Sequence, residues 1–240
     1  MILQIAHVTI STINFEMTIK NLHKLGYTTK FLENKQKNLK IKKNLMTNFP
    51  DFHKIALLES KKNCNLEIVQ YDETNMVDHT FLQPKIINSS ISDSEFLHFI
   101  ENDIQEKTFF DTSKDFEFLN LKVFTQDINK SMIFWKKFGF SPISETKNKF
   151  NIKFDSLTSE KKYKLELIKK PTNAPFLNNH GVSCLALITN SIVFEKKSLD
   201  DDGYFTTDIE FLNVGGNKVA IFFCKNTCGE IVELISLNHK

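Results

Sequence analysis

The chain of 240 residues is 41% hydrophobic and 25% charged, a globular composition long enough for one large domain or two small ones. Its formal net charge of +2 creates no strong field toward nucleic acid or a membrane surface, and all 31 basic residues are lysines. Because bidentate recognition of phosphates and base edges usually falls to arginine, we expect neither a nucleic-acid partner nor a membrane partner.

The start of the chain and its cysteines bear on the compartment. Residues 1–5 lead directly into a strand pattern, and no segment approaches the roughly 18 apolar residues of a membrane span. Four scattered cysteines are too few for a disulfide scaffold, so we expect a reducing, cytoplasmic location. Cys224 and Cys228 precede Gly229, and either a metal or redox pair or a plain hairpin turn explains their spacing.

Residues 1–71 predict one β-α-β-β-β unit. The stretch 3–12 is rich in β-branched side chains and predicts a strand. Asn14 can cap a helix with apolar residues at helical spacing, and Gly26 ends that helix. Three strands are predicted at 27–33, 53–59 and 64–71, and the Lys/Asn-rich stretch 34–51 predicts a solvated loop or a ragged hairpin.

The same order of elements returns twice after residue 116, as expected of a repeated architecture. The first copy predicts a strand at 118–125, a helix at 127–138 ended by Gly139, and strands at 141–146, 150–155 and 163–169. After a linker at 171–175, the second copy predicts a strand at 182–189, a helix around 191–199, and strands at 205–212, 218–223 and 230–235.

A shorter piece lies between these units, at residues 72–115. It predicts a strand at 85–91 and a helix from Asp93 to about Gln105 that Ser92 caps, but no further strands. We therefore expect an N-terminal half at 1–115, with a full module at 1–71 and a truncated one at 72–115. A C-terminal domain at 116–240 would hold the modules 116–170 and 180–240. The fold class is α+β, with repeated modules that form curled mixed sheets.

One acidic residue stands between aliphatic neighbours in the last strand of each full module, as Glu67, Glu166 and Glu233. A carboxylate on the inner face of a half-buried sheet costs several kcal/mol unless it is paired, hydrogen-bonded or bound to a metal. A single glutamate of this kind is easily an outward-facing residue. Three at matching places make coincidence a weaker explanation.

The repeated β-α-β-β-β units, the helices that end in Leu/Phe-Gly-Tyr/Phe, and the final Gly-x-x-Val-Glu-Leu-Ile resemble the vicinal oxygen chelate superfamily. That group contains glyoxalase I, the fosfomycin and bleomycin resistance proteins and the extradiol dioxygenases. The resemblance implies that two modules pair to curl a sheet into a cup. It also implies a divalent metal held by residues on the first and last strands of the modules, which are His and Glu in glyoxalase I.

The resemblance implies ligand positions in this chain, although no consecutive pair of modules has a full set. His7 and Glu67 match in the first module and Glu233 in the last, and pairing of the first module with the last would gather them. His180 or a water would fill the fourth place, for Fe²⁺, Mn²⁺, Ni²⁺ or Zn²⁺. Glu233 could act as the catalytic base. The matching positions elsewhere hold Asn120, Ser183 and Pro84 or Lys85, while Glu166 is kept.

Two functions remain open at this point. The first is a metal-dependent lyase, isomerase or dioxygenase of glyoxalase type that acts on a small oxygenated or aromatic molecule, as a monomer or homodimer. The second is a metal-free protein that binds or sequesters a small molecule, as bleomycin-resistance proteins do. The replacements at Asn120 and Ser183 favour the second function, and the set of His7, Glu67 and Glu233 favours the first.

Overall fold

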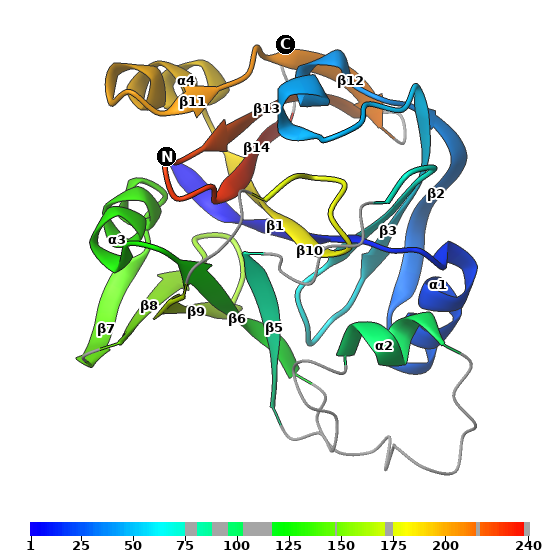
Figure 1. Cartoon of the computed structure of the whole chain (residues 1–240), viewed down its shortest axis with the longest axis horizontal. Coiled ribbons are helices and arrows are strands. Elements are labelled where there is room, and N and C mark those ends of the chain that lie inside the picture. The colour runs from blue at the N-terminus through cyan, green and yellow to red at the C-terminus, as the bar shows by residue number, and fades with distance from the viewer. Residues whose placement is uncertain are drawn as a thin grey trace.

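The computed structural model describes two β-sheets and the helices that flank them (Figure 1). The described residues are 1–74, 81–87, 96–102, 117–146, 148–170, 175–214 and 217–237. Among them no helix has both the length and the apolar character needed to cross a membrane. The fold is α+β, as the sequence predicted.

The larger sheet joins strands from the two ends of the chain. Its strands run in the order β11-β13-β14-β10-β1-β4-β3-β2, with β12 beside β13. Their bounds are β1 (Ile2–Ser11), β2 (Thr28–Lys37), β3 (Phe52–Glu59), β4 (Leu66–Tyr71), β10 (Gly181–Thr189), β11 (Phe205–Thr206), β12 (Glu210–Val214), β13 (Asn217–Lys225) and β14 (Ile231–Leu237). The first module therefore pairs with the last module.

The junction of this sheet is the antiparallel pair β1 and β10, which lie side by side across the centre of Figure 1. Eight of the nine residues of β10 are buried, so this strand is covered on both faces. Its sequence, Gly-Val-Ser-Cys-Leu-Ala-Leu-Ile-Thr, is the nearly continuous apolar run expected of such a strand. β1 also pairs in parallel with β4, and β10 with β14, which makes the sheet mixed.

The smaller sheet joins β5, from the stretch 72–115, to the strands of the stretch 116–170. Its strands run in the order β5-β6-β9-β8-β7. The bounds are β5 (Leu82–Ile87), β6 (Glu117–Thr125), β7 (Ser141–Thr146), β8 (Lys149–Asp155) and β9 (Lys162–Lys169). In β9 the buried residues Tyr163, Leu165 and Leu167 alternate with more exposed ones, as period-two strand geometry requires of a sheet with one covered face.

Four α-helices follow strands, at α1 (Phe15–Lys24), α2 (Phe96–Glu101), α3 (Ile128–Lys137) and α4 (Ile192–Asp201). Asn14 and Asp127 cap α1 and α3 by accepting a hydrogen bond from a backbone N–H of the first turn, as expected for Asn14. The predicted stops are also present, because Gly26 and Gly139 adopt φ values of +84° and +87° that favour glycine.

The sequence predicts a solvated loop or a ragged hairpin at 34–51, and the structure has the hairpin, because β2 and β3 pair antiparallel as far as Lys37 and Phe52, with a register shift. β2 continues to Lys37, and a 3-10 helix, η1 (Lys40–Leu45), follows. Leu45 is fully buried and Lys42 is only 8% exposed, because this segment packs onto the inner face of the large sheet. Local composition pointed to solvent, and a tertiary contact overrode it.

Smaller differences concern element boundaries. β5 begins at Leu82, three residues before the predicted start, and the predicted strand at 205–212 is divided into β11 and β12. Of the predicted helix from Asp93 to about Gln105, the structure has α2 at Phe96–Glu101. The rest of that prediction, at 93–95 and 103–105, and most of the predicted linker, at 171–174, lie outside the described residues.

Candidate metal centre

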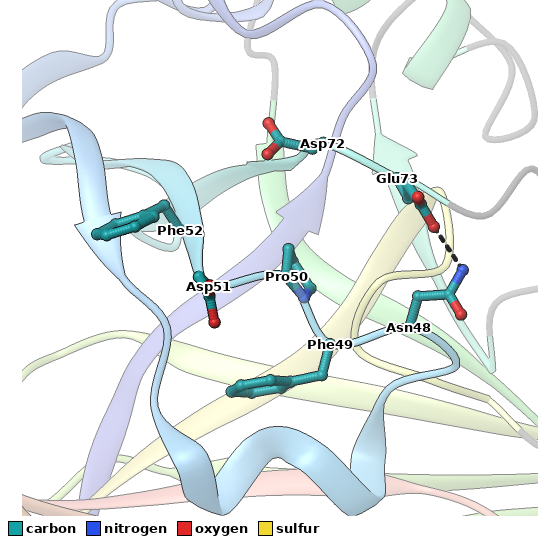
Figure 2. A pocket seen from close by; sticks show the side chains of 7 residues that line it. All are labelled: Asn48, Phe49, Pro50, Asp51, Phe52, Asp72 and Glu73. Atoms are coloured by element: carbon teal, nitrogen blue, oxygen red, sulfur yellow. Dashed lines mark hydrogen bonds between the residues drawn. The ribbon is translucent and has the colours of Figure 1, made fainter.

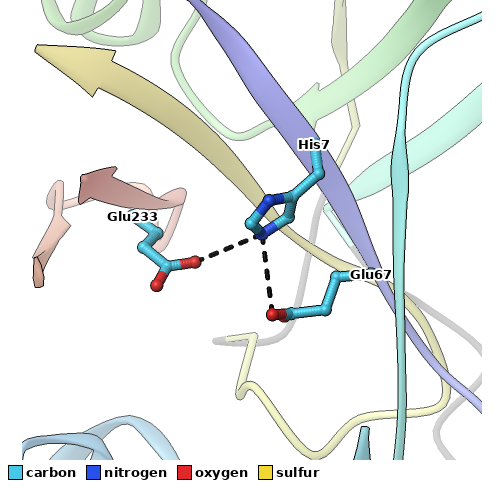
Figure 3. Close-up of side chains that lie close together, drawn as sticks. All are labelled: His7, Glu67 and Glu233. Carbon is cyan, nitrogen blue, oxygen red and sulfur yellow. Dashed lines mark ion pairs between the residues drawn. The ribbon is translucent and has the colours of Figure 1, made fainter. Parts of the chain in front are cut away.

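Three side chains from distant parts of the sequence meet on the inner face of the large sheet (Figure 3). They are His7 on β1, Glu67 on β4 and Glu233 on β14. His7 Nε2 lies 3.8 Å from Glu67 Oε1 and 3.5 Å from Glu233 Oε2. One ligand atom from each residue lies within 4.8 Å of the other two. The predicted convergence of these three residues is thus present in the fold.

Strand register explains why they meet. His7 pairs with Ala186 across the β1–β10 junction, and Ala186 pairs with Glu233 on the next strand. On the other side of β1, Thr9 pairs with Glu67. Residues 7 and 9 share a face because strand side chains alternate, so both carboxylates reach the same side. The Thr9 hydroxyl also donates a hydrogen bond to Glu67 Oε2 at 3.1 Å.

The site places a buried imidazole between two carboxylates. Burial lowers the pKa of His7, but the nearby charges of Glu67 and Glu233 outweigh that effect and raise the pKa above its ordinary value. The His7 Nε2 atom is buried and makes no hydrogen bond among the described residues. A bound ligand or metal ion would satisfy a buried nitrogen that makes no hydrogen bond.

The spacing of the three groups fits a shared cation. Two ligands that each lie about 2.1 Å from one ion are about 3.0 Å apart at a right angle and about 4.2 Å apart when opposite. The two distances from His7 Nε2, 3.8 Å and 3.5 Å, fall within that interval. One imidazole and two carboxylates are also a donor set that suits Fe²⁺, Mn²⁺, Ni²⁺ and Zn²⁺.

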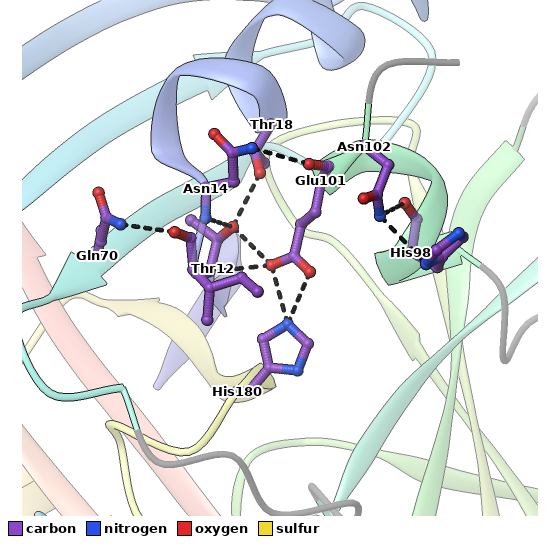
Figure 4. Close-up of polar contacts among 9 residues, drawn as sticks. Thr12, Asn14, Thr18, Gln70, His98, Glu101, Asn102 and His180 are labelled. Atoms are coloured by element: carbon purple, nitrogen blue, oxygen red, sulfur yellow. Dashed lines mark hydrogen bonds and ion pairs between the residues drawn. The ribbon is translucent and has the colours of Figure 1, made fainter.

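His180, the expected fourth ligand, does not belong to this cluster. Its Nε2 lies 2.9 Å and 2.8 Å from the two carboxylate oxygens of Glu101, which also accepts a hydrogen bond from Thr12 at 2.6 Å (Figure 4). The reason is the position of His180 along the sheet. His180 precedes Gly181, which pairs with Ser11, whereas His7 pairs with Ala186. Five strand residues separate those levels by about 17 Å.

The small sheet carries no comparable group of metal-binding side chains in the described part of the chain. Glu166 is bound instead by Lys149 at 2.9 Å and Lys85 at 3.6 Å. Burial raises the pKa of Glu166, but these lysines lower it below its ordinary value. The lysine at position 85 therefore neutralises the carboxylate that a ligand histidine would have joined. Ser183, in the last module, is buried with its hydroxyl unpartnered among the described residues.

Lys42, which lies on η1, was not a predicted site residue, but its side chain reaches the inner face of the large sheet. Its ammonium lies 5.5 Å from the centroid of the Phe223 ring, and Phe223 pairs with Glu233 on the neighbouring strand. Burial lowers the pKa of Lys42, but the charges of Tyr71, Glu67 and Glu233 raise it well above its ordinary value. The only local signal was the apolar spacing of Leu39, Ile41 and Leu45 around it.

Two more side chains, His53 and Tyr71, are buried where the charge of Lys42 acts on them. His53 and Tyr71 form a cross-strand pair with ring centroids 5.4 Å apart. Burial and the charge of Lys42 lower the pKa of His53 to about 3, so His53 is neutral at physiological pH. Its Nδ1 atom makes no hydrogen bond among the described residues.

A pocket of about 420 Å³ lies at the end of the segment that carries η1 (Figure 2). Its lining is Asn48, Phe49, Pro50, Asp51, Phe52, Asp72 and Glu73. Asn48 donates a hydrogen bond to Glu73 across it at 2.6 Å. None of His7, Glu67 and Glu233 lines this pocket, so it is separate from the metal centre.

Cys224 and Cys228 form no disulfide and belong to no group of metal ligands in the described residues. Burial raises the pKa of Cys224 to about 12, which keeps it a thiol rather than a reactive thiolate. Gly229 has a φ of +92° and donates its backbone N–H to Asn226 at 3.0 Å. A hairpin turn accounts for this stretch, in line with the simpler of the two explanations.

The curled mixed sheet, built from strands of the two ends of the chain, is that of the glyoxalase-like fold. Solved structures agree. Glyoxalase I from Zea mays aligns over 97% of this chain and 92% of its own, with 13% sequence identity and a TM-score of 0.52. A mutant of that enzyme covers 97% and 93%, with 12% identity and a TM-score of 0.54. No protein-family model matches the sequence, and no curated protein matches it.

Proposed function

We propose that this protein is a divalent-metal-dependent enzyme of glyoxalase type, a lyase, isomerase or dioxygenase that acts on a small oxygenated molecule. The observation that carries the proposal is the convergence of His7, Glu67 and Glu233 on the inner face of the sheet. His7 Nε2 and one oxygen of each carboxylate would hold the ion. A divalent metal supplies polarisation of a substrate oxygen and stabilisation of negative charge.

The two carboxylates have different surroundings, which suggests different roles. Glu67 is oriented by the hydroxyl of Thr9. Among the described residues no hydroxyl donates to the Glu233 carboxylate, and its Oε2 lies 3.5 Å from His7 Nε2. Glu233 is therefore freer to turn toward a substrate proton, and we assign it the role of general base. Glu67 would remain a fixed ligand.

The segment 38–51 would limit access of water to the chemistry. It lies over the inner face and leaves the side chains of His7 and Glu233 9% exposed and that of Glu67 15% exposed. A dry site strengthens electrostatic interactions with charge that develops on the substrate. The four buried, unbonded cysteines are compatible with the reducing cytoplasm that we propose as its location.

The test is metal content. Protein purified without chelator, or dialysed against Mn²⁺, Ni²⁺, Fe²⁺ or Zn²⁺, should hold about one ion per chain by elemental analysis. Glu233→Gln keeps the shape and removes a charged ligand, so its metal affinity should fall about tenfold or more with an unchanged circular dichroism spectrum. Glu166→Gln is the matched control and should keep the ion. Wild-type protein without stoichiometric metal in any of these preparations would rule the proposal out.

A second candidate is a metal-free binding protein of the bleomycin-resistance type. It is favoured by Lys42, whose ammonium offsets the charges of Glu67 and Glu233 without an ion. In that case a hydrophobic small molecule should raise the melting temperature with increasing concentration, and the increase should survive EDTA. Loss of all ligand stabilisation on chelation would exclude this candidate.

A further inference from the structure

We propose that Lys42 binds an anionic group of the substrate, so that the cup takes a small oxyanion such as a hydroxy acid or an oxo acid. The inference rests on the proposed metal centre and adds the substrate class. Its basis is the buried position of Lys42, the absence of a described acceptor for its ammonium, and the charge that the cup would carry.

Lys42 is held in place from both sides of its segment. Leu177 donates its backbone N–H to Leu45 at 2.8 Å, and Asn178 accepts a hydrogen bond from the Thr47 N–H at 3.1 Å. The Asn38 side chain donates to Pro50 at 3.0 Å and closes the base of the segment. Lys42 is therefore positioned on the inner face by a fixed connection.

The N–H groups of the Lys42 ammonium have no hydrogen-bond acceptor among the described residues. No hydrogen bond or ion pair within 4.0 Å joins the Lys42 ammonium to another described residue, and it lies 5.5 Å from the centroid of the Phe223 ring. Other lysines of the chain, such as Lys149 and Lys137, have a carboxylate within 2.9 Å or less. An ammonium carries three donors, and burying it without an acceptor is costly. An oxygen of a bound ligand would satisfy it.

The sign of the ligand follows from the charges around it. Glu67 and Glu233 together cancel a divalent cation, and Lys42 then leaves the cup with one positive charge when His7 is neutral. An anion is attracted to such a cup, because opposite charges at close range in a poorly solvated site attract strongly. Without the ion, the charges of Glu67 and Glu233 at least cancel those of Lys42 and His7, so the cup does not attract an anion. Binding should therefore be ordered, with the metal before the anion.

The experiment uses the full-length chain loaded with Co²⁺, whose visible absorption reports on its ligands. Oxalate serves as the anionic probe and imidazole as the neutral one, each in a separate titration. Lys42→Met should weaken oxalate binding about tenfold or more, because a hydrogen bond between two charged groups is lost. It should leave the imidazole affinity within about twofold of wild type. Lys43→Met, an exposed lysine of the same segment, should change neither.

The outcomes separate the two proposals. If Lys42→Met and wild type bind oxalate equally, Lys42 does not bind the anion and this inference is overturned while the metal centre stands. If wild type takes up no Co²⁺, both proposals fall. Should Lys42→Met not fold, Lys42→Gln keeps a polar side chain, removes the charge and should show the same loss of oxalate binding. Oxalate binding by the metal-free protein would also contradict the ordered scheme.

Discussion

Glu101 and Glu230 occupy similar places, beside a threonine at the end of a strand and the helix that follows it. Glu101 accepts a hydrogen bond from Thr12 at the end of β1, and Ser131 of α3 donates to both Glu230 and Thr125. Their partners differ in charge. Despite burial, which raises it, the pKa of Glu101 is lowered below its ordinary value by His180 and Thr12.

Glu230 has only neutral partners. Ser131 and Asn226 donate to its carboxylate, the latter at 3.0 Å, and the residue is fully buried. Burial raises the pKa of Glu230 to about 7, because these hydrogen bonds do not offset the loss of water. The same kind of position thus holds a carboxyl group with a lowered pKa in one module pair and one with a raised pKa in the other.

The raised pKa of Glu230 predicts that the free energy of unfolding depends on pH. Its pKa rises from an ordinary value of 4.5 to about 7 in the folded chain, so the folded state binds more protons between these values. Stability contributed by this group is present below about pH 4.5 and is lost as the pH rises toward 7, by an amount on the order of 3 kcal/mol. Glu230→Gln should lose less stability than wild type between pH 5 and 7.

Urea denaturation at a series of pH values measures this difference. Glu59→Gln is a suitable control, because Glu59 is a partly exposed residue paired only with Lys30 at the surface. The control should follow the wild-type curve. A Glu230→Gln curve parallel to wild type over the same interval would show that Glu230 does not change protonation there.

At the scale of elements, the segment 38–51 contributes most to the surroundings of the site. It carries η1, lies over the inner face of the large sheet and contributes residues 48–51 to the lining of the 420 Å³ pocket. One buried amide contributes to its attachment, since the side chain of Asn178 accepts from the Thr47 N–H and donates to the Thr47 hydroxyl at 2.9 Å. Asn178 is fully buried, so water does not replace these bonds easily.

Asn178→Ala should therefore loosen the cover of the cup. We expect the free energy of unfolding to fall by about 1–2 kcal/mol, because the partly buried hydrogen bonds that the Asn178 side chain makes to Thr47 are lost. Hydrogen–deuterium exchange of the Thr47 amide should become faster, while exchange in β10 stays close to wild type apart from the global change. Both quantities are measurable on the metal-free chain.

Asn48→Ala is the matched control for that experiment. Asn48 lies in the same segment, but its hydrogen bond to Glu73 is exposed. Its loss should change stability by less than about 0.5 kcal/mol. Equal effects of the two substitutions, or unchanged exchange at Thr47 in Asn178→Ala, would show that Asn178 does not anchor the segment.

At the scale of the whole molecule, the two sheets are linked by α3. The helix follows β6 of the small sheet, yet Phe134 packs against Tyr204 of the last module with ring centroids 5.2 Å apart. Lys137 forms an ion pair with Asp202 at 2.6 Å. One hydrophobic cluster includes buried residues from both sheets. We therefore expect the described structure to unfold as one cooperative unit.

Trp135, the single tryptophan, tests this cooperativity, because it lies on α3 outside the cup. A metal that binds to His7, Glu67 and Glu233 should raise the melting temperature observed by Trp135 fluorescence as much as that observed by circular dichroism. Glu233→Gln, with its weaker metal affinity, should show smaller increases by both methods at the same metal concentration. A metal-induced shift in circular dichroism without one in fluorescence would show that the two sheets unfold independently.

The elements and their repetition were predictable from the sequence because they depend on local chemistry. Apolar spacing and caps define α1 and α3, and Gly26 and Gly139 end them since the backbone there has positive φ. His7, Glu67 and Glu233 were also selected from the sequence, through the resemblance of their strands to a known family. Their metal binding remains a proposal.

Tertiary structure alone decided how the modules pair and what surrounds the site. The β1–β10 junction brings together residues about 180 positions apart, and local pattern contains no information on which strands of similar composition become neighbours. The same register places His180 beside Glu101, at the start of β10 and away from His7, Glu67 and Glu233. It also made a covered face on which Lys42, from a stretch that looked solvated, is buried beside the two carboxylates.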